Sequence, residues 1–410
     1  MKLFKLAIVL YSSHRVLASE LQTPLQASPG LSSAETPAYR HDLVSLHRQL
    51  IEIPSVTFTE QEVGNFLIDY LTARNFVAEP QFLPQTNDSE KPRFNVLAWP
   101  GPDRHPKPKV LVSSHIDTVP PFIPYSRTEG MLTPDTLIAG RGSVDAKASV
   151  AAQITAVIAL LDEGAIVDPA DVMLLFVVGE ERTGDGMRQF SDSVAARDPP
   201  TSFEAAIFGE PTEGKLACGH KGFFGCEVTA RGRAGHSGYP WLGKSATEVL
   251  MRGLVEVLDA DLDLGDGEEG FGNTTINVGT ILGGVAANVI PESAVAQIAG
   301  RVAIGPEAEG GRVVAERVRG ILQGVDEDAF GLECKNGYGV VKCDCDVDGF
   351  ETITVNYGTD VPNFKGNHTR YLYGPGSIMV AHGPDEAIKL KDLESAVEDY
   401  KKLILHVLLD

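Results

Sequence analysis

Hydrophobic positions along the first half of the chain follow two periods that alternate with each other. Helical spacing is found in three segments, residues 43–53, 61–75 and 148–161. Short apolar runs typical of strands lie at residues 95–99, 109–113, 172–179 and 205–208. Strands that alternate with helices are typical of an α/β fold with a largely parallel sheet, and we predict that fold for this half of the chain.

The pattern changes near Lys215. Strand and helix signals then follow in the order β-α-β-β-α, at residues 222–232, 245–258, 274–282, 295–303 and 309–322. This order resembles a small α+β, ferredoxin-like sandwich, and we place its final strand at residues 353–357. The α/β pattern resumes near Asn363 and closes with an amphipathic helix at residues 391–409. We therefore predict a larger domain in two parts, residues 37–216 and 331–410, with a smaller domain inserted at residues 217–330.

Composition sets limits on the partners of such a protein. A chain of 410 residues favours two domains, and 43% hydrophobic with 22% charged residues is typical of a globular protein. The formal net charge of −21 argues against nucleic acid as a partner, because phosphate binding needs clustered Lys and Arg. No segment reaches the apolar length that spans a bilayer, so we expect no membrane partner.

The N-terminal residues have the organisation of a secretory signal. Lys2 and Lys5 precede a short apolar run, and Val16-Leu17-Ala18 resembles a signal-peptidase site. We interpret residues 1–18 as a signal peptide and expect a secreted, extracellular protein. A short buried helix is the alternative.

Sequons and cysteines are consistent with secretion. Asn87, Asn273 and Asn367 each begin an N-x-S/T sequon and are candidate glycosylation sites. The five cysteines leave at least one thiol unpaired, and their spacing would allow two local pairings, one within residues 218–226 and one within residues 334–345. We interpret them as structural, and the sequence leaves their pairing open.

Two adjacent carboxylates, Glu180 and Glu181, follow the apolar strand at residues 172–179. Side chains alternate between the two faces of a strand, so one strand end cannot bury both in one apolar core. Like charges side by side also raise each other's pKa. A solvated loop is the simplest interpretation, and a bound cation or a proton-transfer role is the alternative.

Other metal-competent side chains favour the second interpretation. His115 and Asp117 follow the strand at residues 109–113, Asp145 precedes a long helix, Glu210 follows the strand at residues 205–208, and His382 lies near the C-terminus. Ligands of an open parallel sheet bind beyond the carboxyl ends of its strands, so these groups could face one crevice. Two imidazoles and three carboxylates fit two zinc ions, with one carboxylate bridging them.

The same ordered set is similar to that of the co-catalytic zinc aminoacylase/carboxypeptidase family, which includes acetylornithine deacetylase, succinyl-diaminopimelate desuccinylase and glutamate carboxypeptidase. The matching motifs are SSHIDTVP, GRGSVDAKASVAA, VVGEERTGDGM, GEPTEG, RGRAGHSGYP and AHGPDE. The resemblance runs from about residue 45 to the end of the chain. It implies a zinc-hydrolase domain with an inserted lid or dimerisation domain.

The resemblance implies a role for each metal-competent residue. His115 binds one zinc ion and His382 the other, Asp145 bridges both, and Glu181 and Glu210 each complete the coordination of one ion. The expected cofactor is therefore two zinc ions per subunit.

The resemblance also implies the residues that carry out catalysis. Glu180 is the general base that activates a water held by the zinc ions. Asp117 orients His115. A cis peptide is expected at Asp145–Ala146, although many members have Asp where this chain has Ala146.

The inserted domain is expected to contribute to the substrate site. By resemblance, His236 reaches an active site, often that of a partner subunit, and stabilises the tetrahedral oxyanion. Asn288, Arg301 and Gly376 resemble substrate-binding positions, and Arg301 would suit a substrate carboxylate. A surface arginine at a strand end is the alternative. Bacterial relatives form dimers through this domain and other relatives are monomers, so a homodimer is the partner we expect.

The sequence therefore predicts a secreted, zinc-dependent metallo-exopeptidase of the carboxypeptidase type that hydrolyses a peptide or amide bond. Biosynthetic deacylation is an intracellular activity, so a secreted protein fits peptides better. The alternative is an N-acyl-amino-acid deacylase. A non-catalytic binding protein on the same fold is the alternative from another class, and the intact ligand set with Glu180 argues against it.

Overall fold

The computed structural model describes residues 36–85, 91–102, 107–335 and 337–409. The predicted signal peptide, residues 1–18, and the sequon at Asn87 lie outside the described residues. Within the described part, no helix is both long and apolar enough to cross a lipid bilayer.

The predicted helices form, with bounds that agree to within a few residues, and Asp185–Ala195 is a further helix that the sequence analysis did not predict. The α-helices of the described residues are α1 Arg40–Glu52, α2 Gln61–Thr72, α3 Lys147–Asp162, α4 Asp185–Ala195, α5 Ala246–Asp259, α6 Gly310–Val325 and α7 Leu390–Leu409.

A nine-stranded sheet is the framework of the larger domain. Its strands are β1 Phe76–Phe82, β2 Phe94–Pro100, β3 Val110–His115, β6 Val172–Val177, β7 Ala205–Gly209, β8 Leu216–His220, β15 Val341–Lys342, β16 Thr352–Val355 and β17 Thr369–Tyr373. Their order is β1-β2-β6-β3-β7-β17-β8-β15, with β16 paired to β8. The strands β6, β3, β7 and β17 run parallel, whereas β1 with β2 and β8 with β15 are antiparallel. The sheet is therefore mixed, and the predicted parallel arrangement holds for its centre.

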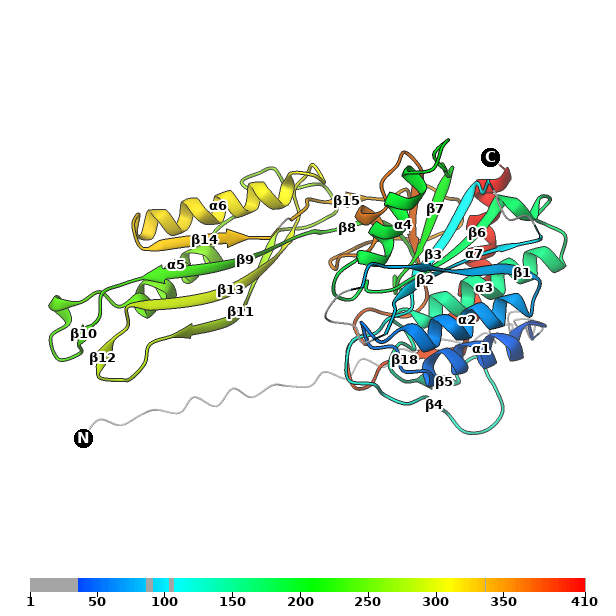
Figure 1. Cartoon of the computed structure of the whole chain (residues 1–410), viewed down its shortest axis with the longest axis horizontal. Coiled ribbons are helices and arrows are strands. Elements are labelled where there is room, and N and C mark those ends of the chain that lie inside the picture. Colours follow the sequence, from blue (N-terminus) through cyan, green and yellow to red (C-terminus); the bar gives the residue numbers. More distant parts are fainter. Residues whose placement is uncertain (1–35, 86–90, 103–106, 336, 410) are drawn as a thin grey trace, which may run out of the picture. The chain divides into compact units, whose positions relative to one another are not determined.

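Both faces of this sheet are covered by helices. The side chains of Val172, Leu174 and Phe176 pack with α1, α2, α3 and α7, and the alternate residues of β6 pack with α4 on the other face (Figure 1). Strands buried on both faces are continuous apolar runs, as β6 is. The carboxylates Glu180 and Glu181 therefore come only after β6 has ended.

The smaller domain has a four-stranded antiparallel sheet. Its strands are β9 Gly222–Arg231, β11 Thr275–Gly283, β13 Ser293–Val302 and β14 Phe330–Cys334, in the order β11-β13-β9-β14. Residues of α5 and α6 share one hydrophobic core with β9 and β13, and Figure 1 shows both helices along this sheet. The remaining short strands are β4 Ser126–Arg127, β5 Leu137–Ala139, β18 Ala387–Lys389, β10 Gly235–His236 and β12 Val289–Ile290.

The predicted final strand of the smaller domain was wrong. The strand near residues 353–357 is β16, which pairs in parallel with β8 in the large sheet. The strand that completes the small sheet is β14, at its edge beside β9. Both are short segments with similar apolar content, and only the long-range pairing distinguishes them.

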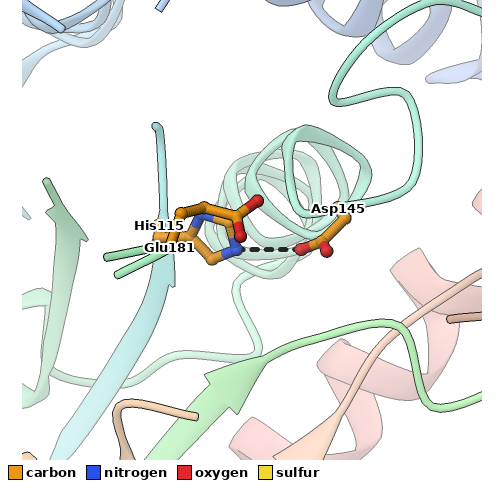
Figure 2. A group of neighbouring side chains, drawn as sticks. All are labelled: His115, Asp145 and Glu181. Atoms are coloured by element: carbon orange, nitrogen blue, oxygen red, sulfur yellow. Dashed lines mark hydrogen bonds and ion pairs between the residues drawn. The ribbon is translucent and has the colours of Figure 1, made fainter. Parts of the chain in front are cut away.

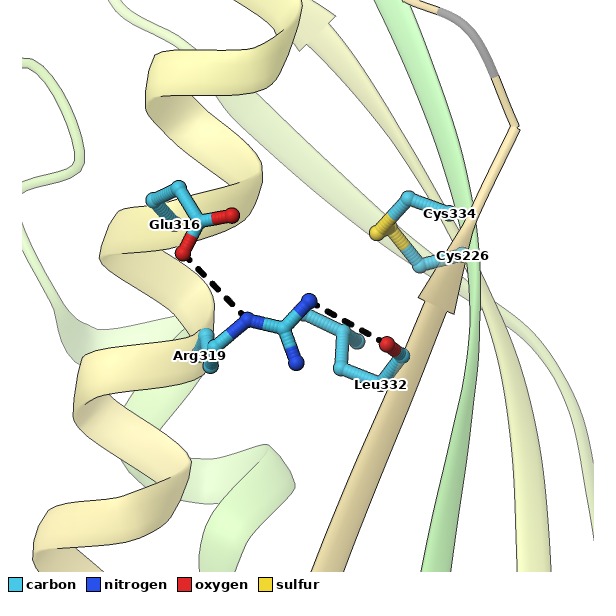
Figure 3. The surroundings of a disulfide bond; sticks show 5 residues. All are labelled: Cys226, Glu316, Arg319, Leu332 and Cys334. Carbon is cyan, nitrogen blue, oxygen red and sulfur yellow. Dashed lines mark hydrogen bonds and ion pairs between the residues drawn. A yellow bond between two sulfur atoms is a disulfide. The ribbon is translucent and has the colours of Figure 1, made fainter.

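The two disulfides are long-range, so neither of the local pairings that the spacing would allow is formed. Cys226 and Cys334 face each other on β9 and β14 and are bonded, and Cys218 is bonded to Cys345. Figure 3 shows the first of these beside α6, where Arg319 donates to the carbonyl oxygen of Leu332. Cys343 keeps its thiol free, as the odd count requires.

Candidate metal centre

The metal-competent residues lie in segments that meet at the carboxyl ends of the parallel strands. His115 is the last residue of β3, and the strands β6 and β7 on either side lead directly to Glu180–Glu181 and to Glu210. Asp145 stands just before α3, and His382 follows β17 in the loop that leads to β18. This edge is where open α/β sheets bind ligands.

Asp145 lies between two imidazoles. Its Oδ1 atom is 3.0 Å from Nε2 of His115, and its Oδ2 atom is 3.2 Å from Nε2 of His382. Figure 2 shows the carboxylate of Asp145 and the ring of His115 pointing toward each other, with Glu181 alongside. One carboxylate with an imidazole at each oxygen is the arrangement expected of a bridging ligand.

The two glutamates that were predicted as ligands lie beside different imidazoles. Glu181 Oε2 is 3.0 Å from His382 Nε2, and Glu210 Oε2 is 3.9 Å from His115 Nε2. The structure therefore has two donor sets, each with one imidazole and one glutamate, and Asp145 is common to both. A ligand atom of Glu180 also lies within 4.8 Å of those of His115 and Glu210.

The acidic groups of this cluster are buried beside one another. Burial raises the pKa of Glu180 well above its ordinary value, and the charge of Glu210 raises it further, whereas His115 opposes the shift. Burial raises the pKa of Glu210 in the same way. Burial would also raise the pKa of Asp145, but hydrogen bonds from His115 and His382 outweigh it and lower that pKa.

This donor set fits divalent cations. Four carboxylates face two imidazoles; the residues Asp145 and Glu210 are buried, and Glu180 and Glu181 are half-buried. No lysine or arginine of the described residues forms an ion pair with any of the four. Without cations of their own, such charges cost several kcal/mol each to bury. Imidazole nitrogen and carboxylate oxygen are ligands that zinc accepts, so the residues present suit a two-metal site.

Asp117 contacts both His115 and the turn that carries Glu180 and Glu181. The contact with the turn was not predicted from the sequence. The Nδ1 atom of His115 donates to the backbone carbonyl of Asp117 at 3.0 Å, which leaves Nε2 free to face Asp145. The Asp117 carboxylate lies 3.6 Å from that ring and instead accepts the backbone N–H groups of Glu180 at 3.1 Å and Glu181 at 3.3 Å. Asp117 therefore fixes the turn that carries the two glutamates as well as the ring of His115.

A second buried carboxylate, which the sequence analysis missed, holds the loop of Asp145. Glu386 Oε1 accepts the backbone N–H groups of Gly142, Val144 and Asp145 at 3.0–3.2 Å, and Oε2 pairs with Arg141 at 2.6 Å. Arg141 also donates to the carbonyl oxygen of His382. The pair thereby ties the loop of Asp145 to the loop of His382. The signal was available, because Glu386 stands four residues after His382 inside the motif AHGPDE.

A buried ion pair also supports the turn after β6. Arg93 pairs with Glu60 at 3.0 Å and with Asp185 at 2.7 Å. Gly179 has φ +78°, and a side chain there would overlap Arg93 and Asp185. Only glycine suits such a position, so the turn that starts Glu180–Glu181 is determined by packing as well as by hydrogen bonds.

A cleft of about 370 Å³ opens beside the cluster. Its walls include Asp145, Glu180, Glu181, Glu210, His382, Arg182, Arg188, Phe223, Arg301, Tyr338, Tyr357, Asp360 and Asn363. Arg301 thus lines the same cleft as the acidic cluster, and its guanidinium lies 5.6 Å from the centre of the Phe223 ring. The expected cis peptide is present at Asp145–Ala146.

The other predicted substrate residues are not brought to this cleft. His236 and Asn288 are exposed and lie together, where β10 pairs with β12 and the amide of Ser237 donates to the carbonyl oxygen of Asn288. Gly376 has φ +79° and packs beside Val144, and neither its position nor those of His236 and Asn288 line the cleft. The described sequon residues Asn273 and Asn367 are exposed.

Comparison with known proteins finds one matching family model and similar proteins that cover most of the chain. Residues 111–406 match the model of the peptidase family M20/M25/M40. An M20-domain protein of Sordaria macrospora is 55% identical over 95% of this chain and 90% of its own length. A probable carboxypeptidase of Aspergillus oryzae is 45% identical over 94% of this chain and 93% of its own.

Solved structures show the same fold at low identity. A tripeptidase from Staphylococcus aureus superposes with a TM-score of 0.73 at 18% identity, over 90% of this chain and 99% of its own. An M20 family metallo-carboxypeptidase from Sulfolobus solfataricus superposes with a TM-score of 0.66 at 16% identity, over 90% of this chain and 100% of its own.

Proposed function

The chain belongs to the peptidase family M20/M25/M40, and from this premise we propose that it is a carboxypeptidase that uses two zinc ions held around Asp145. The observation that carries the proposal is the pair of donor sets that share the Asp145 carboxylate, with Glu180 beside them. Relatives that are 45% identical over most of the chain and are named probable carboxypeptidases support the type of peptidase.

His115, Asp145 and Glu210 would hold one zinc ion, and His382, Asp145 and Glu181 the other. When bound, the two ions would polarise the scissile carbonyl and lower the pKa of the attacking water. Asp117 and Glu386 keep these side chains in place through backbone N–H groups, so the ligands need little rearrangement to bind.

Glu180 is the proposed general base and acid. It takes a proton from the attacking water and delivers it to the nitrogen that leaves. Its backbone is fixed by Asp117, and its carboxylate lies among His115 and Glu210, where burial raises its pKa. A carboxyl group with a raised pKa binds the proton more tightly, so it can carry the proton from the water to the leaving nitrogen.

Arg301 is the proposed anchor for the C-terminal carboxylate of the substrate. It lines the cleft, and its guanidinium has no hydrogen bond or ion pair with a side chain in the part of the chain that the structure describes and lies over the Phe223 ring. A free guanidinium fork in a cleft suits a carboxylate. An N-acyl amino acid would present the same carboxylate, so a deacylase is the second candidate.

A substrate panel tests the assignment. Purified protein would be given peptides with a free C-terminus, the same peptides amidated at the C-terminus, and N-acetyl amino acids. We expect release of the C-terminal residue from the free peptides alone. Faster hydrolysis of N-acetyl amino acids would favour the deacylase, and equal cleavage of the amidated peptides would contradict the role of Arg301. Loss of all hydrolysis in a chelator, with recovery on adding zinc, tests the cofactor.

We also propose that the protein is secreted. Two disulfides suit an oxidising compartment, and the exposed Asn273 and Asn367 are accessible for glycosylation. Mass spectrometry of the protein from culture medium should show cleavage after Ala18 and glycans at these asparagines. Accumulation of the full-length chain inside cells would contradict the proposal.

We propose a homodimer formed through the smaller domain, with His236 acting in the partner's active site. Met251, Val255 and Leu258 form an exposed apolar stripe on α5, and β11 is an edge strand. His236 is exposed and lines no part of its own cleft. Mixing the inactive variants Glu180→Gln and His236→Ala should restore up to about a quarter of the wild-type activity, because half of the dimers would contain one complete site. A monomer by sedimentation would contradict this arrangement.

A further inference from the structure

A buried carboxylate that the mechanism above does not use lies in the loop between β16 and β17. Asp360 is 5% exposed, and its Oδ1 atom accepts a hydrogen bond from Asn363 Nδ2 at 2.7 Å. Its Oδ2 atom is buried and accepts no hydrogen bond from any described residue. An acceptor that is buried without a donor costs free energy, so its retention calls for a functional explanation.

The position of Asp360 suggests what would use the oxygen. It lines the cleft together with Glu180, and it also lines a small cavity behind the cleft with His115, Glu180 and Glu210. It is not part of either cluster of possible metal-binding atoms among the described residues. Asp360 therefore faces the reacting region without being placed as a metal ligand.

Arg301 lies against the same loop. Gly358 is two residues before Asp360, and a Cβ atom there would come within 2.5 Å of the Tyr338 hydroxyl and 3.6 Å of Arg301 Nη1. The absence of a side chain at Gly358 lets the guanidinium approach the loop. Arg301 and Asp360, which has one unpaired oxygen, therefore both line the cleft, and the guanidinium lies near the loop that carries Asp360.

This pair is complementary to the C-terminal residue of a peptide. Such a residue has a carboxylate and the scissile N–H on the same α-carbon. Arg301 suits the carboxylate, and the unpaired Oδ2 atom of Asp360 suits the nitrogen, which is a donor before cleavage and a cation after it.

The loop is held firmly enough for this role. Asn363, which donates to Asp360, accepts from Arg188 Nη1 at 3.4 Å. Thr359 Oγ1 is 3.0 Å from Nε2 of the buried His220 and accepts the amide of Val361 at 3.1 Å. Asp360 is therefore positioned by contacts on both sides of it.

We propose that Asp360 Oδ2 accepts the N–H of the scissile bond and then holds the amine of the departing amino acid, an assignment that rests on the proposed function. The oxygen of water bonds to the carbonyl carbon and the C–N bond breaks. Both water protons end on the nitrogen, one of them through Glu180, so the products are a carboxylate and an ammonium ion. Asp360 is then a specificity-determining residue for a free α-amino leaving group.

Inhibition by the product tests the contact between Asp360 and the amine separately from catalysis, because an inhibitor binds without reacting. L-leucine and 4-methylpentanoate differ only in the α-amino group, and each would be measured as a competitive inhibitor of the wild type and of Asp360→Asn. We expect L-leucine to bind about tenfold more tightly than 4-methylpentanoate to the wild type, as for a charge-assisted hydrogen bond. In Asp360→Asn the ratio should fall to about one, with the binding of 4-methylpentanoate unchanged within about twofold.

Two control variants show whether the effect belongs to Asp360. Asp348→Asn, at an exposed position, should keep the tenfold ratio. Arg301→Ala should weaken both inhibitors together. Metal content and thermal unfolding of Asp360→Asn would show that the variant is folded, and calorimetry on the wild type alone tests the ratio without any variant.

Two outcomes would overturn the assignment. One is a wild-type ratio near one, and the other is a tenfold ratio that persists in Asp360→Asn. Failure of the proposed function would give another result, which is that the wild type releases no amino acid from any peptide or N-acetyl amino acid.

Discussion

The loops of the metal centre and the β10–β12 ribbon of the smaller domain are both expected to serve one reaction, but they differ in burial and in how they are supported. His115, Asp145 and Glu210 are at most 6% exposed, and buried carboxylates hold the loop of Asp145 and the turn of Glu180. His236 and Asn288 are exposed, in a two-stranded ribbon. The residues of the metal centre come together within one chain. Those of the ribbon do not line the cleft, so they would need a second subunit or a bound substrate to take part in the reaction. Substitutions should therefore act on chemistry and stability in the first region and on activity alone in the second.

The largest effect should come from Glu180→Gln, which keeps the shape of the metal-centre loops and removes the proton acceptor. We expect kcat to fall about 10²–10⁴-fold, the usual contribution of a general base or acid. Metal content measured by mass spectrometry should stay at the wild-type level. A variant with wild-type kcat would show that another group handles the proton.

Glu386→Ala should destabilise the same region without touching substrate. It removes one partner of a fully buried ion pair and three backbone hydrogen bonds, so the free energy of unfolding should fall by about 3–5 kcal/mol. Glu268, paired with Lys342 at the surface, gives the matched control. Glu268→Ala should cost less than about 1 kcal/mol in the same urea titration. Equal losses in the two variants would contradict the difference between the regions.

A pH titration tests His220, which supports the loop of Asp360. Burial lowers its pKa to about 4, the hydrogen bond to the carbonyl oxygen of Lys221 opposes the shift, and Arg301 and Arg370 add to it. Above pH 6.5 the ring is neutral in both states. As the pH falls from about 6.5 to 4 the unfolded chain binds the proton and the folded one does not, so stability should fall by about 3 kcal/mol. His220→Gln should flatten this part of the stability curve, and an unchanged curve would assign the loss to other groups.

The smallest effect on stability should be that of His236→Ala. An exposed side chain of this kind contributes within about 0.5 kcal/mol to the free energy of unfolding. Its kcat should nevertheless fall, because in the proposed mechanism His236 donates to the oxyanion. If unfolding and turnover both remain at the wild-type level, the ribbon has no role in the reaction.

Much of this architecture could be predicted from the sequence because the signals were local. Apolar periodicity located the central strands β3, β6 and β7 and, within the described residues, every α-helix except α4. The ends of these three strands located His115, Glu181 and Glu210. The two glutamates first resembled a solvated loop, and the structure brings them, half-buried, into a cluster with Asp145 and both imidazoles.

What could not be predicted depends on long-range pairing. The partners of Cys218 and Cys226 are more than a hundred residues away, and the choice between β14 and β16 as the last strand of the small sheet depends on the same contacts. Glu386 and Asp360 are acidic residues in polar loops by sequence alone. The motif AHGPDE draws attention to Glu386, but only the folded chain shows that Glu386 supports Asp145 and that Asp360 faces the cleft.

Metal stoichiometry tests the central claim most directly. Active protein, dialysed and measured by inductively coupled plasma mass spectrometry, should contain two zinc ions per chain. His115→Ala should lose one ion, and Asp145→Ala, which removes the carboxylate common to both donor sets, should lose both. Asp145→Ala that retains two ions, or fully active wild-type protein with far less than one, would contradict the account.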